Sequence, residues 1–283
     1  MISIQAPAKV NLYLHVTGRR SDGYHLLDSL FVFTTDGDVI RVQESETLSL
    51  KITGPYAGAL PAKEDNIVLK AAGKLAEAAG MPAKAEIVLE KNLPVASGIG
   101  GGSADAAAAL KALMRLWKIT VPAEKLSEIA LSLGADVPSC LASRAVQVAG
   151  IGDVLTPAPS LPKLFVLLVN PNKPVSTPAV FKARKPVFSP ACPFTEKVTD
   201  FEAFIKDLSR RHNDLCEAAC QIEPSVRSVL QALSGDPVCR LARMSGSGGT
   251  CFGLFSCAGD AFSCCERIKA AHPEWWFLNT RVI

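Results

Sequence analysis

Polar and hydrophobic residues alternate along much of the first fifty positions, which is the pattern of strands that bury one face. From residue 9 to 17 this period of two puts Lys9 and Asn11 on one face and Val10 and Leu12 on the other. The same reading predicts strands at 2–5, 9–17, 28–34, 38–43, 47–53, 85–90, 146–148, 164–169, 239–243, 250–255 and 275–281. Helical spacing predicts helices at 65–79, 103–117, 122–133, 201–209, 213–221, 224–233 and 260–271. The order of these elements predicts an α+β fold.

Prolines mark the expected division of the chain. Three of them fall in residues 157–162, which we interpret as the passage between an N-terminal lobe, residues 1–156, and a C-terminal lobe, residues 163–283. At 283 residues the chain exceeds the usual size of a single core. The proline-rich stretch 171–200 is expected to form a surface excursion.

Composition excludes several classes of protein. A net charge of +3, with no Lys/Arg run longer than two, argues against a nucleic-acid partner. No apolar run approaches the roughly 18 residues of a membrane span, so no membrane partner is expected. Nine cysteines are an odd number, and an alternating N-terminus does not resemble a signal peptide, so we expect reduced thiols and a cytoplasmic protein.

The most informative segment runs from residue 94 to 104 into the helix-forming stretch after it. Four glycines, Gly98, Gly100, Gly101 and Gly102, allow positive φ and close approach of main-chain N–H groups to an anion at a helix N-terminus. The spacing fits neither a Walker A loop nor a dinucleotide fingerprint, and protein-kinase motifs are absent from the sequence. We interpret the segment as a cradle for the phosphates of ATP; the alternative is a plain turn between strand and helix.

Lys9, Asn11 and Asp136 are candidates for phosphoryl-transfer chemistry, which requires charge neutralisation and an oriented acceptor hydroxyl. The alternatives are a solvated strand face for Lys9 and Asn11 and a turn or cap residue for Asp136. Pro138 is expected to hold Val137 extended, which would present Asp136 from a turn.

Two further segments carry candidate binding groups. Tyr24 and His25 offer a stacking face and a hydrogen-bonding edge suited to a nucleobase, although a lone histidine is usually structural. The glycine cluster at 245–250 joins two predicted strands, and we interpret it as a second main-chain nest for phosphates instead of a plain hairpin.

Taken together, residues 7–12, 94–104 and 245–250 resemble the three motifs of the galactokinase, homoserine kinase, mevalonate kinase and phosphomevalonate kinase superfamily. The segments that resemble the branch of it acting on a substrate with a cytidine diphosphate group are 22–25, 64–66, 134–138, 178–181 and 213–214. The resemblance extends over nearly the whole chain. It implies an N-terminal lobe similar to ribosomal protein S5 domain 2 and a ferredoxin-like C-terminal lobe.

The resemblance also implies an activity, ATP-dependent phosphorylation of the 2-hydroxyl of a methylerythritol that carries cytidine diphosphate, in the non-mevalonate isoprenoid pathway. Asp136 would be the catalytic base and Lys9 would hold it ionised. The implied ATP-binding residues are Pro94, Val95, Ala96, Ser97, Gly98, Ile99, Gly100, Gly101, Gly102, Ser103, Ala104, Asn66 and Lys91. The implied substrate-binding residues are Asn11, Tyr24, His25, Thr177, Phe181, Gly246 and Gly248, with Tyr24 and Phe181 enclosing the cytosine and His25 reading its edge.

Magnesium is expected with ATP, but the loop departs from the common pattern. Ser103 is followed by Ala104 where a second serine is frequent, so Ser103 alone is a weak candidate ligand. Three alternatives stay open: a homoserine-type or mevalonate-type kinase, a catalytically silent nucleotide-binding protein, and an RNA binder on the S5-like lobe. The oligomeric state, monomer or homodimer, is not determined by the sequence.

Overall fold

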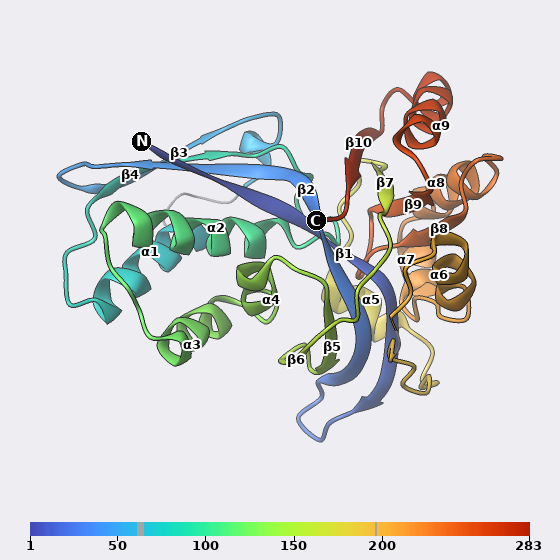
Figure 1. Ribbon diagram of the computed structural model, residues 1–283, viewed down its shortest axis with the longest axis horizontal. Helices are drawn as coiled ribbons and strands as arrows, with labels where there is room; N and C mark the ends of the chain where they lie inside the picture. The colour runs from blue at the N-terminus through green and yellow to red at the C-terminus, as the bar shows by residue number, and fades with distance from the viewer. Residues whose placement is uncertain (61–64, 196) are drawn as a thin grey trace. The chain divides into compact units, whose positions relative to one another are not determined.

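The computed structural model describes residues 1–60, 65–195 and 197–283 (Figure 1). They form two compact units that interleave along the chain. The first unit comprises Met1–Lys9, Asp36–Val95 and Gly100–Ser143, and the second comprises Val10–Thr35, Ala96–Ile99 and Arg144–Ile283. The predicted lobes, residues 1–156 and 163–283, do not coincide with these units, and their boundaries stay a prediction. Glu64, part of the predicted motif at 64–66, lies outside the described residues.

Two long strands, β1 (Ile2–Arg19) and β2 (His25–Gln43), pair with each other and pass from one unit into the other. Each had been expected as two separate strands. Pro7 is tolerated within β1 because β1 pairs with β2 alone among the described strands, and an edge position has no need of the N–H that proline lacks.

In the first unit, β2 pairs antiparallel with β4 (Ala85–Glu90), which pairs parallel with β3 (Leu48–Thr53). Along β4, residues alternate between buried and half-buried, as the period of two predicts. The helices that the structure describes in this unit are η1 (Ala57–Ala59), α1 (Ile67–Ala78), α2 (Gly101–Leu116), α3 (Ala123–Leu133) and α4 (Val137–Ala142). Figure 1 shows α1 and α2 lying along one face of β3 and β4, and these two helices pack on each other.

In the second unit, the first half of β2 pairs with β5 (Val146–Gly150), which pairs with β6 (Val154–Pro157). A separate antiparallel sheet has the order β10 (Trp276–Arg281), β7 (Phe165–Asn170), β9 (Cys251–Phe255) and β8 (Leu241–Met244). The helices of this unit are α5 (Thr177–Ala183), α6 (Phe201–Leu208), α7 (Cys216–Ile222), α8 (Ser225–Ser234) and α9 (Ala258–Ala271). The apolar sides of α8 and α9 pack on this sheet and form a core with α7 (Figure 1).

Two helices contradict the sequence-based expectations. Residues 171–200 include α5, and Val137 is the first residue of α4 instead of an extended residue. Both helices carry their proline, Pro178 or Pro138, in the first turn, where the missing N–H would have no partner within the helix. Strand β6 was also not predicted.

The nine cysteines all lie among the described residues and are free thiols. Within the part of the chain that the structure describes, no helix combines the length and apolarity needed to cross a bilayer.

Candidate active site

The ion pair between Lys9 and Asp136 lies in the first unit, with 3.0 Å between Lys9 Nζ and Asp136 Oδ2. The side chain of Lys9 on β1 is 5% exposed, so the interpretation of this strand face as solvated is wrong. Asp136 occupies the N-cap position of α4, makes no side-chain cap bond, and is 32% exposed. A buried ammonium is therefore paired with a carboxylate that solvent and ligands can reach, which suits a group that must accept a proton.

The glycine loop has the conformation of an anion cradle at the start of α2. Gly98 has φ 76° and Gly100, the N-cap of α2, has φ 65°. Gly100 has no side chain to cap this helix end, so among the described residues the first N–H groups of α2 point toward its N-terminus without a side-chain cap. Gly101 and Gly102 form the first turn of α2 at negative φ; the expectation of positive φ for all four glycines is wrong for these two.

The ion pair and the cradle are adjacent. A Cβ added at Gly100 would lie 3.1 Å from Cβ and Cε of Lys9 and 3.9 Å from Asp136 Oδ2. Gly100 thus needs both its positive φ and its lack of a side chain. A phosphoryl group held at the N-terminus of α2 would lie next to a cation and a base.

In the second unit, the loop at 245–250 packs on residues 96–99. A Cβ at Gly98 would lie 2.4 Å from Ser245 O and 2.6 Å from Gly248 O. Ser245 Oγ donates to Gly98 O over 3.0 Å, and the N–H of Thr250 donates to Ser97 O over 3.0 Å. The loop joins β8 to β9, as expected, with φ 55° at Gly246 and 89° at Gly248.

Asn11, two residues after Lys9 on β1, is 2% exposed and held by two serines. Its main-chain N–H donates to Ser245 Oγ over 3.1 Å, and its Nδ2 donates to Ser29 Oγ over 3.0 Å. The amide is therefore fixed in place before any ligand binds.

The aromatic candidates also lie in the second unit. The rings of His25 and Phe181 stack with centroids 5.0 Å apart and an interplanar angle of 27°, whereas the Tyr24 side chain is 62% exposed. Burial, with Arg184 and Arg19 nearby, lowers the pKa of His25, so its ring is neutral near neutral pH and offers one donor and one acceptor nitrogen. Thr177 and Ser247 share a hydrogen bond of 2.6 Å between their hydroxyls.

Models described as the GHMP kinases N terminal domain and the GHMP kinases C terminal match residues 66–144 and 194–273. Curated 4-diphosphocytidyl-2-C-methyl-D-erythritol kinases from Paramagnetospirillum magneticum and Rhodospirillum rubrum are each 54% identical to this chain; the matches cover 99% and 98% of it and 98% and 91% of those proteins. The chain belongs to this family of GHMP kinases.

Solved structures agree with that assignment. A crystal structure of 4-(cytidine 5'-diphospho)-2C-methyl-D-erythritol kinase is 34% identical over 100% of both chains with a TM-score of 0.82. A homoserine kinase from Cytophaga hutchinsonii shares the fold with a TM-score of 0.68, at 19% identity over 100% of this chain and 96% of its own. The predicted superfamily, its α+β fold and an ATP-dependent kinase activity are confirmed.

The resemblance had assigned Lys91 to ATP. In this GHMP kinase, its ammonium group is paired with two carboxylates in a buried cluster of the first unit. Its ammonium binds Asp38 Oδ2 and lies 2.9 Å from Asp105 Oδ2, and all three side chains are at most 2% exposed. Burial disfavours the ammonium, but the two carboxylates outweigh this effect and raise the pKa of Lys91. Asp38 Oδ1 also accepts the N–H groups of Asn92 and Leu93, so the cluster holds the chain that leads into the glycine loop.

Asn66, likewise assigned to ATP, is the N-cap of α1: its Oδ1 accepts the N–H of Val68 over 2.9 Å. Its side chain is 5% exposed. A structural role therefore accounts for both Asn66 and Lys91, and their contact with nucleotide stays a prediction.

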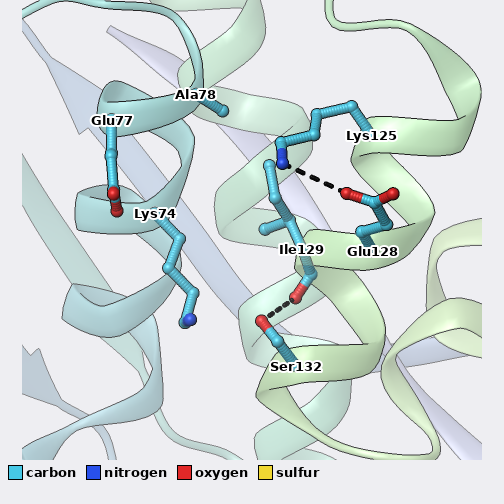
Figure 2. Close-up of a pocket in the computed structure, with 7 residues that line it drawn as sticks. All are labelled: Lys74, Glu77, Ala78, Lys125, Glu128, Ile129 and Ser132. Carbon is cyan, nitrogen blue, oxygen red and sulfur yellow. Dashed lines mark hydrogen bonds and ion pairs between the residues drawn. The ribbon is translucent and has the colours of Figure 1, made fainter.

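A hollow of about 450 Å³ between α1 and α3 contains none of the predicted site residues of this GHMP kinase. Figure 2 shows its charged lining, in which Lys125 pairs with Glu128 over 3.1 Å and Ser132 Oγ donates to Ile129 O. Its lining is unlike the glycine cradle, and we assign it no part in phosphoryl transfer.

Sequence reasoning missed several groups that hold the site of this kinase together. They are Ser29, Asp38, Asp105 and Ser247. Of these, the role of Asp105 could have been suspected from the sequence, because a charged residue among alanines that are expected to be buried requires a buried partner. The serines left none, since short hydroxyl side chains are common on strands and in turns.

Proposed function

We propose that this protein transfers the γ-phosphoryl group of ATP to the 2-hydroxyl of 4-(cytidine 5′-diphospho)-2-C-methyl-D-erythritol. The observation that carries this proposal is the Lys9–Asp136 pair, 3.0 Å apart and directly beside Gly100 at the N-terminus of α2. Curated kinases named for that substrate, 54% identical to this chain, support the choice of acceptor.

In the proposed reaction, the oxygen of the substrate 2-hydroxyl bonds to the γ-phosphorus, and Asp136 accepts the proton that this hydroxyl loses. The bond from that phosphorus to the β,γ-bridging oxygen breaks, and ADP leaves with the electron pair. Lys9 orients Asp136 through their ion pair, and its charge stabilises the oxygens of the transferring group. The N–H groups at the start of α2, with the main chain of the 94–104 loop, hold the phosphates.

Magnesium is the expected companion of ATP, and the residues offer it oxygen ligands. Among the described residues no group of three His, Cys, Asp or Glu side chains could hold a metal, but Mg²⁺ is commonly bound by phosphate oxygens, water and one or two protein groups. The hydroxyl of Ser103, in the first turn of α2, fits such an ion and would be the protein ligand. The bound ion would neutralise phosphate charge.

For the substrate, we propose that Tyr24 and Phe181 enclose the cytosine and that neutral His25 reads its polar edge. The stacked His25 and Phe181 support a nucleobase site there, and Tyr24 is exposed and free of a ring partner among the described residues. Asn11 would bind the sugar alcohol, with Thr177, Gly246 and Gly248 contributing to the remainder of the substrate site.

We further propose that the protein works in the cytoplasm as a monomer or homodimer, with neither a nucleic-acid nor a membrane partner. Nine free thiols support a reducing compartment. Gel filtration with light scattering measures the oligomeric state.

The test is ATP consumption with the cytidine-diphosphate substrate, compared with free methylerythritol, homoserine and mevalonate. We expect turnover with the first substrate alone, and an Asp136→Asn variant sets the background. Preference for homoserine or mevalonate would indicate another kinase of the superfamily. Binding of ATP without turnover on any acceptor would indicate a silent nucleotide-binding protein.

A further inference from the structure

Two serines of the second unit accept hydrogen bonds from Asn11, one from its main-chain N–H and one from its side-chain NH₂. Ser245 Oγ accepts the main-chain N–H of Asn11 and donates to Gly98 O. Ser29 Oγ accepts the side-chain Nδ2 of Asn11 and donates to Tyr13 O. Each serine thus receives a hydrogen from Asn11 and gives its own to a main-chain carbonyl.

These bonds determine which way the Asn11 amide points. A serine hydroxyl has a single hydrogen, and a carbonyl oxygen can only accept. Because Ser29 gives that hydrogen to Tyr13 O, it can only accept from Asn11, so the amide NH₂ must face Ser29. The reversed amide would bring two acceptors together. The carbonyl Oδ1 therefore points the other way, toward Gly246, where an added Cβ would lie 3.4 Å from it.

The hydrogen bonds between Ser29 and Asn11 are buried. Ser29 is 0% exposed and Asn11 2% exposed, so no bulk water can take over the hydroxyl's role. The main chain of Ser29 lies within β2, paired with Val148 of β5. The neighbouring Asp28 accepts the phenolic hydrogen of Tyr13 over 2.7 Å, which adds a second link between β1 and β2 next to the serine.

We propose that Ser29 is a positioning residue that turns the carbonyl oxygen of Asn11 toward the substrate, where it accepts a hydrogen bond from a hydroxyl of the sugar alcohol. The inference rests on the proposed function, because it takes Asn11 as a ligand of that substrate. The inference specifies the direction of this hydrogen bond: the substrate hydroxyl donates it and the carbonyl oxygen of Asn11 accepts it. A substrate analogue with an ether oxygen in place of that hydroxyl would meet an acceptor and bind poorly.

The test compares Ser29→Ala with Ser29→Thr, which keeps the hydroxyl, and with Ser209→Ala as control. Ser209 Oγ donates to Lys206 O on the surface and has no contact with Asn11. For Ser29→Ala we expect the KM of the cytidine substrate to rise about 3- to 10-fold, the size of one lost hydrogen bond between neutral groups. The kcat and the KM of ATP should stay within about twofold of the parent, and Ser29→Thr should restore the KM.

A double-mutant cycle separates an effect through Asn11 from a general loss of structure. If Ser29 acts through Asn11, adding Ser29→Ala to Asn11→Ala should change the KM no further. Additive effects, or an unchanged KM in Ser29→Ala, would overturn the proposal. If thermal unfolding shows that Ser29→Ala does not fold, Ser29→Cys replaces it, since a thiol is a weak donor and acceptor, and an unchanged KM there counts equally against Ser29. A parent protein inactive on the cytidine substrate would instead refute the proposed function.

Discussion

Lys9 Nζ lies 3.0 Å from Asp136 Oδ2, although the two residues are separated by most of the first unit's sequence. The lysine is buried and the carboxylate is partly open, so the charge of the pair is accessible on its acidic side only. The open carboxylate oxygen is the atom that an arriving acceptor hydroxyl can reach, which suits the proposed role of Asp136 as the base.

Replacement of Asp136 by Asn should preserve the fold and nucleotide binding but lower kcat by about 10²- to 10⁴-fold, because an amide cannot accept the hydroxyl proton. Steady-state kinetics on the cytidine substrate measure this loss. Asp153→Asn serves as control, since Asp153 Oδ1 merely accepts the N–H of Ile151 in a turn. A variant at position 136 that retained a third of the parent kcat would place the base elsewhere.

Gly98 and Gly102 should respond oppositely to alanine. At Gly98 a Cβ would meet Ser245 O at 2.4 Å with φ at 76°, whereas at Gly102, within α2, it would meet nothing within 4 Å. Gly98→Ala should therefore lower thermal stability and raise the KM of ATP, and Gly102→Ala should fold at least as stably as the parent. Differential scanning calorimetry and ATP kinetics check both. Equal behaviour of the two variants would argue that Gly98 does not sit against Ser245.

Lys91→Met should act mainly on stability. It leaves two carboxylates, Asp38 and Asp105, buried without their cation, and breaking such a pair typically costs about 3–5 kcal/mol. Urea unfolding measures the loss, and Lys70→Met, which removes an exposed pair with Asp65, should change little. Normal stability combined with weakened ATP binding would instead make Lys91 a nucleotide ligand.

Much of the local conformation of this chain could be predicted from its sequence, and the resemblance anticipated the Lys9–Asp136 pair, but most other long-range partners could not be predicted. The glycine loop, the second glycine cluster and the strand that carries Lys9 were placed correctly, because glycine content and period-two alternation act over a few residues. Asn11 and Ser245 are 234 positions apart, and no local pattern joins them. Lys91 was expected to bind ATP because its ion-pair partners, Asp38 and Asp105, lie 53 and 14 residues away and could not be predicted from the sequence.

The errors have local causes as well. Val137 was expected to be extended because a following proline disfavours the helical region, but α4 begins there and a proline fits the first turn. Helix α5 was not predicted for the same reason: it lies in a proline-rich stretch that was expected to be irregular, but its proline is in the first turn. The start of α2 was placed two residues late, because glycines in a first helical turn cannot be distinguished by composition from the loop before it.

Tyr24→Ala should weaken binding of the cytidine substrate by about 1–3 kcal/mol, the cost of one lost stacking face, with little change in the affinity for ATP. Phe262→Ala is the matched control: Phe262 is 58% exposed against 62% for Tyr24, but it lies on α9. Isothermal titration with each ligand gives both affinities. A Tyr24→Ala variant that lost ATP affinity instead would assign this aromatic to the other nucleotide.

The pH dependence of substrate binding should follow His25. Burial, then the charges of Arg184 and Arg19, lower its pKa from the ordinary 6.5, so the neutral ring predominates above that value. The KM of the cytidine substrate should therefore be constant between about pH 7 and 8 and rise only as the pH falls through the lowered pKa, where the ring gains a proton and its acceptor nitrogen becomes a donor.

Arg184→Gln tests the cause of this profile. It removes one of the two guanidinium charges, so the pKa of His25 should move up and the rise in KM should begin at a higher pH than in the parent. His25→Asn, which has no titrating ring, should abolish the rise. KM measured across the pH range for the three proteins gives the answer. A rise that persisted in His25→Asn would assign the titration to another group, and an identical profile in Arg184→Gln would mean that burial alone keeps the ring neutral.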